Sequence, residues 1–140
     1  MRRDWATTCA LCAMLCLAPL HVAGQELISP QEFLDRVAGK TVEFRYQKTG
    51  QLAGVEHFLS STETVWSSAA GGCRPGQIFI NGRELCFHYP TQANEKTFCW
   101  YPFRKGDQLM VRFARFNMPV VQIATSITDE PLDCDGPPMS

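Results

Sequence analysis

The side chains that could serve as nucleophiles, bases or metal ligands are few and scattered in this 140-residue chain. His57 and His88 are its only histidines after residue 24, and each alternates with apolar neighbours along a strand-like run. No acidic residue lies near either histidine at a spacing typical of a metal motif. We interpret both as structural or surface residues, with a ligand or general base as the alternative.

The serines and glycines form no recognisable catalytic or cofactor-binding motif. The serines at 60–61 and 67–68 lie in turn-like stretches without the G-x-S-x-G pattern that surrounds a serine nucleophile. The glycines between 71 and 76 precede a predicted strand, whereas a phosphate-binding loop leads into a helix. We therefore predict no catalytic residue, no cofactor and no metal ion.

Four cysteines lie beyond the amino-terminal segment: Cys73, Cys86, Cys99 and Cys134. An even number in an exported domain predicts two disulfides formed in an oxidising compartment. The alternative is a four-cysteine zinc site, but such sites usually bring ligands in closely spaced pairs. The spacings of 13, 13 and 35 residues favour disulfides.

The first 24 residues have the pattern of a secretory signal peptide. Arg2-Arg3 is followed by a largely apolar run over 6–20 and by small residues at Val22-Ala23-Gly24. The apolar run is shorter than the roughly 20 residues of a membrane-spanning helix. We therefore predict a signal peptide over 1–24, a periplasmic or secreted product without stable membrane insertion, and one disulfide-linked β domain over 25–140.

The charge of the predicted mature chain is small. The whole chain has formal net charge −1, with 13 Lys and Arg against 14 Asp and Glu. Removing Arg2, Arg3 and Asp4 leaves 11 against 13, a net charge of −2. Because no basic block remains, nucleic acid and anionic membranes are not predicted partners.

One short helix and about eight short strands must position these residues. Ser29 is a candidate N-cap, Pro30 suits the first helical position, and Gly39 ends the helix. Alternation of apolar and polar residues then predicts strands over 41–46, 54–60, 63–67, 78–80, 83–89, 97–103, 108–113 and 120–125. Turn-linked strands indicate a mainly β fold, an antiparallel meander that closes into a small lipocalin-like barrel. Side chains just fill such a barrel, or it holds one small ligand.

Asn81-Gly82 predicts a type I′ hairpin turn in the middle of this meander. A two-residue turn there places Ile80 opposite Arg83 and Ile78 opposite Leu85. The next hairpin brings Cys86 opposite Cys99, near disulfide distance. We predict that bond, and Cys73 with Cys134 follows by elimination.

Cys86 opposite Cys99 also divides the surrounding aromatic residues between two faces. One face carries Leu85, Phe87, Phe98 and Trp100 together with Ile78 and Ile80, and we interpret it as core. The opposite face carries Phe79, Tyr101 and Phe103. These three form either a small cluster beneath the helix or tail, or a binding surface.

The chain resembles a family of small exported bacterial proteins of unassigned function. The shared pattern extends over nearly all of residues 26–137 and comprises Gly39-Lys40-Thr41, Gly54-Val55-Glu56, Trp66, Cys73-Arg74-x-Gly76, Leu85-Cys86-Phe87-x-Tyr89, Cys99-Trp100 and Glu130-Pro131-Leu132-x-Cys134. Members often carry an aromatic residue where Ile78 stands here. The resemblance implies export, one domain and paired cysteines, and it implies no activity.

These observations favour an exported, non-enzymatic binding protein whose partner is an unknown small ligand or protein. One alternative is an inhibitor of a secreted or cell-wall enzyme that uses an exposed loop such as 67–72. Another is a small hydrolase-like enzyme that uses His57 or His88. A hollow barrel, a convergent loop surface or a histidine beside a carboxylate would distinguish the three.

Overall fold

The computed structural model describes residues 22–90, 95–115 and 117–135. Most of the predicted signal peptide, residues 1–21, therefore lies outside the described residues. Within them are one helix and nine strands: β1 (Gln25–Leu27), α1 (Pro30–Val37), β2 (Thr41–Tyr46), β3 (Leu52–Phe58), β4 (Glu63–Ser68), β5 (Cys73–Asn81), β6 (Glu84–Tyr89), β7 (Lys96–Lys105), β8 (Gln108–Phe113) and β9 (Val121–Thr128). No helix in this part of the chain is long and apolar enough to cross a membrane.

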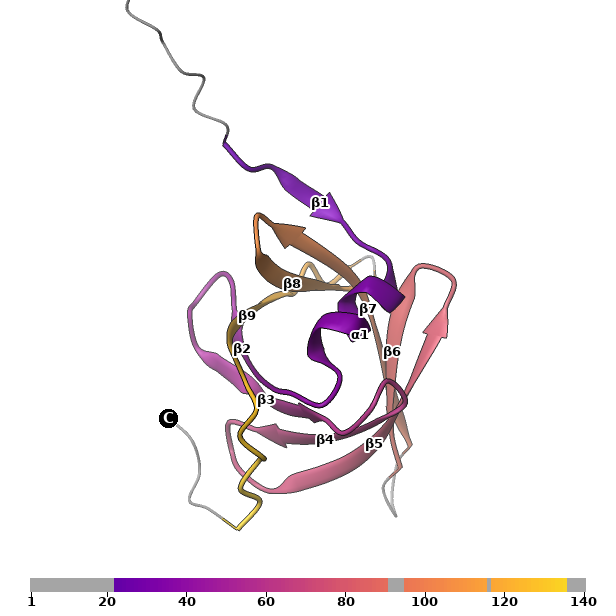
Figure 1. The fold of residues 1–140 in the computed structure, drawn as a ribbon, viewed down its shortest axis with the longest axis vertical. Helices are drawn as coiled ribbons and strands as arrows, with labels where there is room; N and C mark the ends of the chain where they lie inside the picture. Colours follow the sequence, from indigo (N-terminus) through magenta and orange to yellow (C-terminus); the bar gives the residue numbers. More distant parts are fainter. Residues whose placement is uncertain (1–21, 91–94, 116, 136–140) are drawn as a thin grey trace, which may run out of the picture.

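Strands β2 to β9 form a closed antiparallel barrel of eight strands. Each strand pairs with the next along the chain, and β9 returns to pair with β2. The predicted meander and its closure are thus confirmed. The short strand β1 pairs with the end of β7, outside the ring (Figure 1).

Helix α1 closes one end of the barrel (Figure 1). Ser29 caps it as predicted, because its side chain accepts a 3.0 Å hydrogen bond from the backbone N–H of Glu32. The helix buries one apolar face, and the ring of Phe33 packs edge-on against Phe58 at 6.2 Å between centroids. The helix therefore belongs to the barrel core.

The predicted register of the β5–β6 hairpin is wrong by one residue on each strand. Asn81 pairs with Glu84 and Ile80 with Leu85, so the two turn residues are Gly82 and Arg83. Gly82 has φ +59°, and no described non-glycine residue has a positive φ. A glycine alone at the first turn position is the pattern of a type II′ turn. The turn lies one residue later than predicted, so β5 ends at Asn81 and β6 begins at Glu84. The cross-strand partners therefore change by two residues, and side chains that shared a face still share it.

Both disulfides join the predicted partners. Cys86 and Cys99 are opposite each other on β6 and β7, with Cα atoms 4.1 Å apart. Cys73 at the start of β5 is bonded to Cys134, with Cα atoms 5.4 Å apart. The second bond therefore ties the carboxyl-terminal segment to the barrel wall.

Candidate ligand-binding cavity

The inside of the barrel is packed at the end that α1 covers. Buried side chains from α1 and from strands β2, β3, β5, β6 and β8 fill this end: Phe33, Leu34, Val37, Val42, Phe58, Ile78, Leu85 and Leu109. The ring of Phe58 also packs against Phe87, at 6.0 Å between centroids. This end of the barrel is an ordinary hydrophobic core.

The opposite end of the barrel holds a cavity of about 350 Å³. This volume lies at the small end of the roughly 300–1,000 Å³ typical of ligand pockets. Most of its lining is aromatic or aliphatic, with three ionisable residues other than tyrosine: Phe44, Tyr46, Glu56, Trp66, Arg74, Phe87, Tyr89, Lys96, Phe98, Trp100, Val111, Phe113, Met118, Val120 and Gln122. The barrel is therefore filled at one end and hollow at the other.

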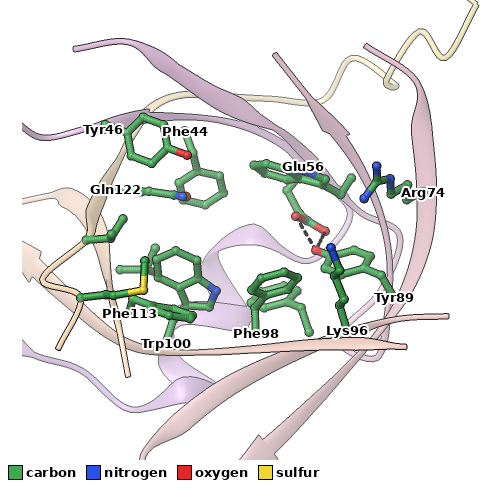
Figure 2. A pocket seen from close by; sticks show the side chains of 15 residues that line it. Phe44, Tyr46, Glu56, Arg74, Tyr89, Lys96, Phe98, Trp100, Phe113 and Gln122 are labelled. Atoms are coloured by element: carbon green, nitrogen blue, oxygen red, sulfur yellow. Dashed lines mark hydrogen bonds between the residues drawn. The ribbon is translucent and has the colours of Figure 1, made fainter. Parts of the chain in front are cut away.

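A row of aromatic rings from β6, β7 and β8 forms one wall of the cavity (Figure 2). Neighbouring centroids are 6.2 Å apart for Tyr89 and Phe98, 6.4 Å for Phe98 and Phe113, and 5.0 Å for Trp100 and Phe113. Each ring is held in place by its neighbours. The prediction of a core face is wrong for Phe98 and Ile80, which are 37% and 44% exposed. Trp100 packs against the core and also lines the cavity.

Two glycines leave room for the larger rings of the lining. A Cβ atom on Gly54 would lie 2.3 Å from Cζ2 of Trp66. A Cβ atom on Gly76 would lie 2.6 Å from Cδ1 of Tyr89. Both contacts are far closer than atoms can approach, so any side chain at either position would displace a ring from the wall.

Glu56 is a buried carboxyl group in the wall of the cavity, with 3% of its surface exposed. The hydroxyl of Tyr89 lies 3.1 Å and 3.0 Å from its two oxygens (Figure 2). The hydroxyl of Thr64 contacts Oε1 of Glu56 and also lies 3.0 Å from the backbone oxygen of His57. Three strands, β3, β4 and β6, thus meet at this carboxyl group.

The neutral form of Glu56 is favoured by burial and not by its hydrogen bonds. The hydroxyls of Thr64 and Tyr89 both donate to the carboxyl group, and such bonds favour its charged form. Burial raises the pKa of Glu56 to about 8, against the opposing effect of the bonds from Thr64 and Tyr89. Burial, together with Glu56, also raises the pKa of Tyr89, whose phenol stays protonated.

Two cationic side chains line the rim of the cavity. Arg74 is opposite Trp66 across the β4–β5 ladder, and Lys96 is opposite Tyr89 across the β6–β7 ladder. Both residues are exposed. Figure 2 shows them on the same side of the cavity as Glu56.

Neither histidine lies in the cavity. His57 follows Glu56 along β3 and therefore points to the outer face of the barrel. His88 is also outside the cavity lining, and its Nδ1 lies 2.9 Å from the hydroxyl oxygen of Thr97 on the neighbouring strand. Neither forms a hydrogen bond with a carboxylate among the described residues, the arrangement that would have favoured the hydrolase-like alternative.

The structure separates the three residues of the candidate binding surface. Phe79 is 45% exposed, whereas Phe103 is 7% exposed. Tyr101 is partly buried, donates a 3.0 Å hydrogen bond to Glu84 and lies under the guanidinium of Arg112. Because Phe103 is buried, the three side chains do not form one exposed surface.

The described acidic, histidine and cysteine residues offer one grouping with metal-like spacing. Glu84, Cys86 and Cys99 have potential ligand atoms within 4.8 Å of one another. Both cysteine sulfurs are joined in a disulfide, so they are not available as thiolates. This grouping therefore reflects the disulfide.

The sequence left open whether the barrel is hollow or filled, and it did not single out Glu56. The signal for Glu56 was available, since it alternates onto the same face of its strand as Phe58. Searches of protein-family models, curated proteins and solved structures found no match. The resemblance to a family of exported proteins and the inhibitor alternative with its 67–72 loop thus stay predictions.

Proposed function

We propose that this protein is an exported, non-enzymatic binding protein that holds one small, mainly apolar ligand in the open half of its barrel. The observation that carries the proposal is the cavity of about 350 Å³ at one end of a closed barrel. We use the term lipocalin-like for this arrangement, in which a barrel is closed at one end and hollow at the other. The two disulfides support a site of action in the periplasm or outside the cell.

The composition of the lining supports binding over catalysis. Its described residues include no histidine, serine or cysteine that could serve as a base or nucleophile. Its one carboxyl group, Glu56, accepts hydrogen bonds from the hydroxyls of Tyr89 and Thr64, and neither hydroxyl acts as a base at neutral pH. Burying a ligand against the aromatic wall supplies binding energy of about 25 cal/mol for each Å² of apolar surface removed from water.

A neutral fluorescent probe tests this function. N-phenyl-1-naphthylamine becomes brighter in apolar surroundings, so we expect a saturable rise in fluorescence when it is titrated with the protein. The substitution Val111→Phe adds bulk inside the cavity and should weaken binding about tenfold or more. The same exchange at Val65, which is on β4 outside the lining, is the matched control and should leave binding unchanged.

Circular dichroism checks that both variants fold, and Val120→Phe at the cavity provides a second block if the Val111 variant does not. Absence of saturable binding to the unmodified protein would contradict the proposed function. Equal weakening by the exchanges at Val111 and Val65 would also contradict it.

A further inference from the structure

We infer that the ligand is an amphipathic organic acid, with its apolar body against the aromatic wall and its anionic group beside Arg74 and Lys96. This inference rests on the proposed function and assigns the chemical class of the ligand. Three features of the cavity support this inference: the sign of its charges, their position at the rim, and their place at one end of the aromatic wall.

The charges that line the cavity favour an anion. Among the described lining residues, Arg74 and Lys96 are cationic and Glu56 is the one carboxyl group. Burial keeps Glu56 mostly neutral at neutral pH, because its effect on the pKa outweighs that of the bonds from Thr64 and Tyr89, which favour the charged form. With Glu56 neutral, the cavity presents two positive charges and no negative charge to a ligand.

Neither cation is paired with an acid in the part of the chain that the structure describes. Elsewhere in the barrel, Arg45 pairs with Glu43 and Arg104 with Glu26, each at 2.7 Å. No such salt bridge to a described residue occurs at Arg74 or Lys96. A guanidinium and an ammonium on the same side of the cavity both offer donors to a carboxylate-like group.

The two cations lie on one side of the cavity, and the aromatic wall extends from Tyr89 on that side to Trp100 and Phe113. In Figure 2, Arg74 and Lys96 lie beside Tyr89, whereas Trp100 and Phe113 lie on the far side. A ligand that fills the cavity therefore meets rings along its body and cations at one end. Because Arg74 and Lys96 are exposed, its acidic group stays in contact with water and avoids full desolvation.

Glu56 makes this preference dependent on pH. The groups facing it are the hydroxyls of Thr64 on β4 and Tyr89 on β6, with Arg74 on β5 and Lys96 on β7 as the charged residues on its side. When Glu56 loses its proton at alkaline pH, its negative charge opposes that of the ligand. Binding of an acid should therefore weaken as pH rises through about 8, the pKa of Glu56.

Three ligands with one ring system and different head groups test the inference. Isothermal titration calorimetry near pH 7 should show 2-naphthoate binding at least about fivefold more tightly than 2-naphthalenemethanol. It should show 2-naphthylmethylammonium binding most weakly. The double variant Arg74→Gln with Lys96→Gln should bring the affinity for the acid within about twofold of that for the alcohol.

A matched double variant controls for net charge. Arg83→Gln with Lys105→Gln removes the same two charges at the α1 end of the barrel, and the acid preference should persist. Equal affinity for acid and alcohol in the unmodified protein, or a preference for the ammonium compound, would overturn the inference alone. Loss of the preference in the control variant would do the same. Failure of all three ligands to bind would contradict the proposed function and the inference together.

Discussion

The two ends of the barrel are built from the same eight strands, but only one end is filled. Along β3, Phe58 points inward at the α1 end and is fully buried, and Glu56 points inward two residues away at the cavity. Along β7, Pro102 is buried at the α1 end and Phe98 borders the cavity. The difference lies in what covers each end, because α1 inserts its apolar face into one opening.

The two ends of this small domain therefore have different roles. Eight strands enclose an interior that side chains can just fill or that holds one small ligand, and this chain does both. The packed end, with α1 and the core around Phe58, stabilises the fold. The open end keeps an exposed ring at Phe98 and a buried carboxyl group at Glu56.

The largest expected effect concerns Glu56, where the two ends meet. Its pKa is 4.5 in an ordinary setting and about 8 in the folded protein. The stability contributed by keeping it neutral is therefore fully present below pH 4.5 and is lost as pH rises through 8. At about 1.4 kcal/mol per pKa unit, the free energy of unfolding should fall by up to about 5 kcal/mol over this range.

The variant Glu56→Gln keeps the shape and cannot ionise, so it should lack this pH dependence. Urea unfolding between pH 4.5 and 9 measures both proteins, and the variant should be the more stable of the two at pH 9. Glu84→Gln is the control, because this partly exposed acid shares a hydrogen bond with Tyr101 and lies outside the cavity. Parallel stability curves for Glu56→Gln and the unmodified protein would show that the carboxyl is ionised in the folded state.

A second prediction compares aromatic truncations at the two ends. Phe58→Ala should lower the free energy of unfolding by ~3–5 kcal/mol, because it leaves a void in a packed core. Phe98→Ala should lower it by about 1 kcal/mol, because that ring is 37% exposed beside an existing cavity. Urea unfolding at fixed pH gives both values. Equal losses would mean that the cavity end contributes as much to stability as the packed end.

The sequence predicts the packed end of the barrel better than the open end. Alternation at Val42, Phe44 and Tyr46 predicts which side chains point inward, and Ser29 predicts where the helix begins. Neither shows that α1 covers only one opening, since covering is a tertiary contact between distant segments. The sequence therefore leaves open whether the barrel is hollow or filled.

The register of the β5–β6 hairpin and the burial of Glu56 were hard to predict for similar reasons. Asn81-Gly82 located the hairpin correctly, but the register depends on which residues accept positive φ, and here only Gly82 does. Glu56 was passed over because strand alternation alone does not show whether a carboxyl group is buried. Its bond from Thr64 comes from the adjacent strand β4, whereas Tyr89 is on β6, which does not pair with β3 in the sheet.

The smallest expected effect concerns the histidines. Both His57 and His88 lie outside the cavity lining, so His57→Ala and His88→Ala should each leave the affinity for N-phenyl-1-naphthylamine within about tenfold, or 1.4 kcal/mol. Fluorescence titration measures this directly. A loss beyond tenfold in either variant, with the fold intact, would bring back the alternative in which a histidine acts at the site.

The central claim, that the open end is a ligand cavity, is tested most directly by nitrogen–proton NMR spectra during titration with N-phenyl-1-naphthylamine. Trp66 and Trp100 are the two tryptophans after residue 24, and both line the cavity, so their indole N–H signals are natural reporters. Both should shift as the probe saturates the protein, while the amide signals of Val42 and Leu85 at the packed end stay in place. Unmoved indole signals, or shifts centred on the α1 end, would contradict it.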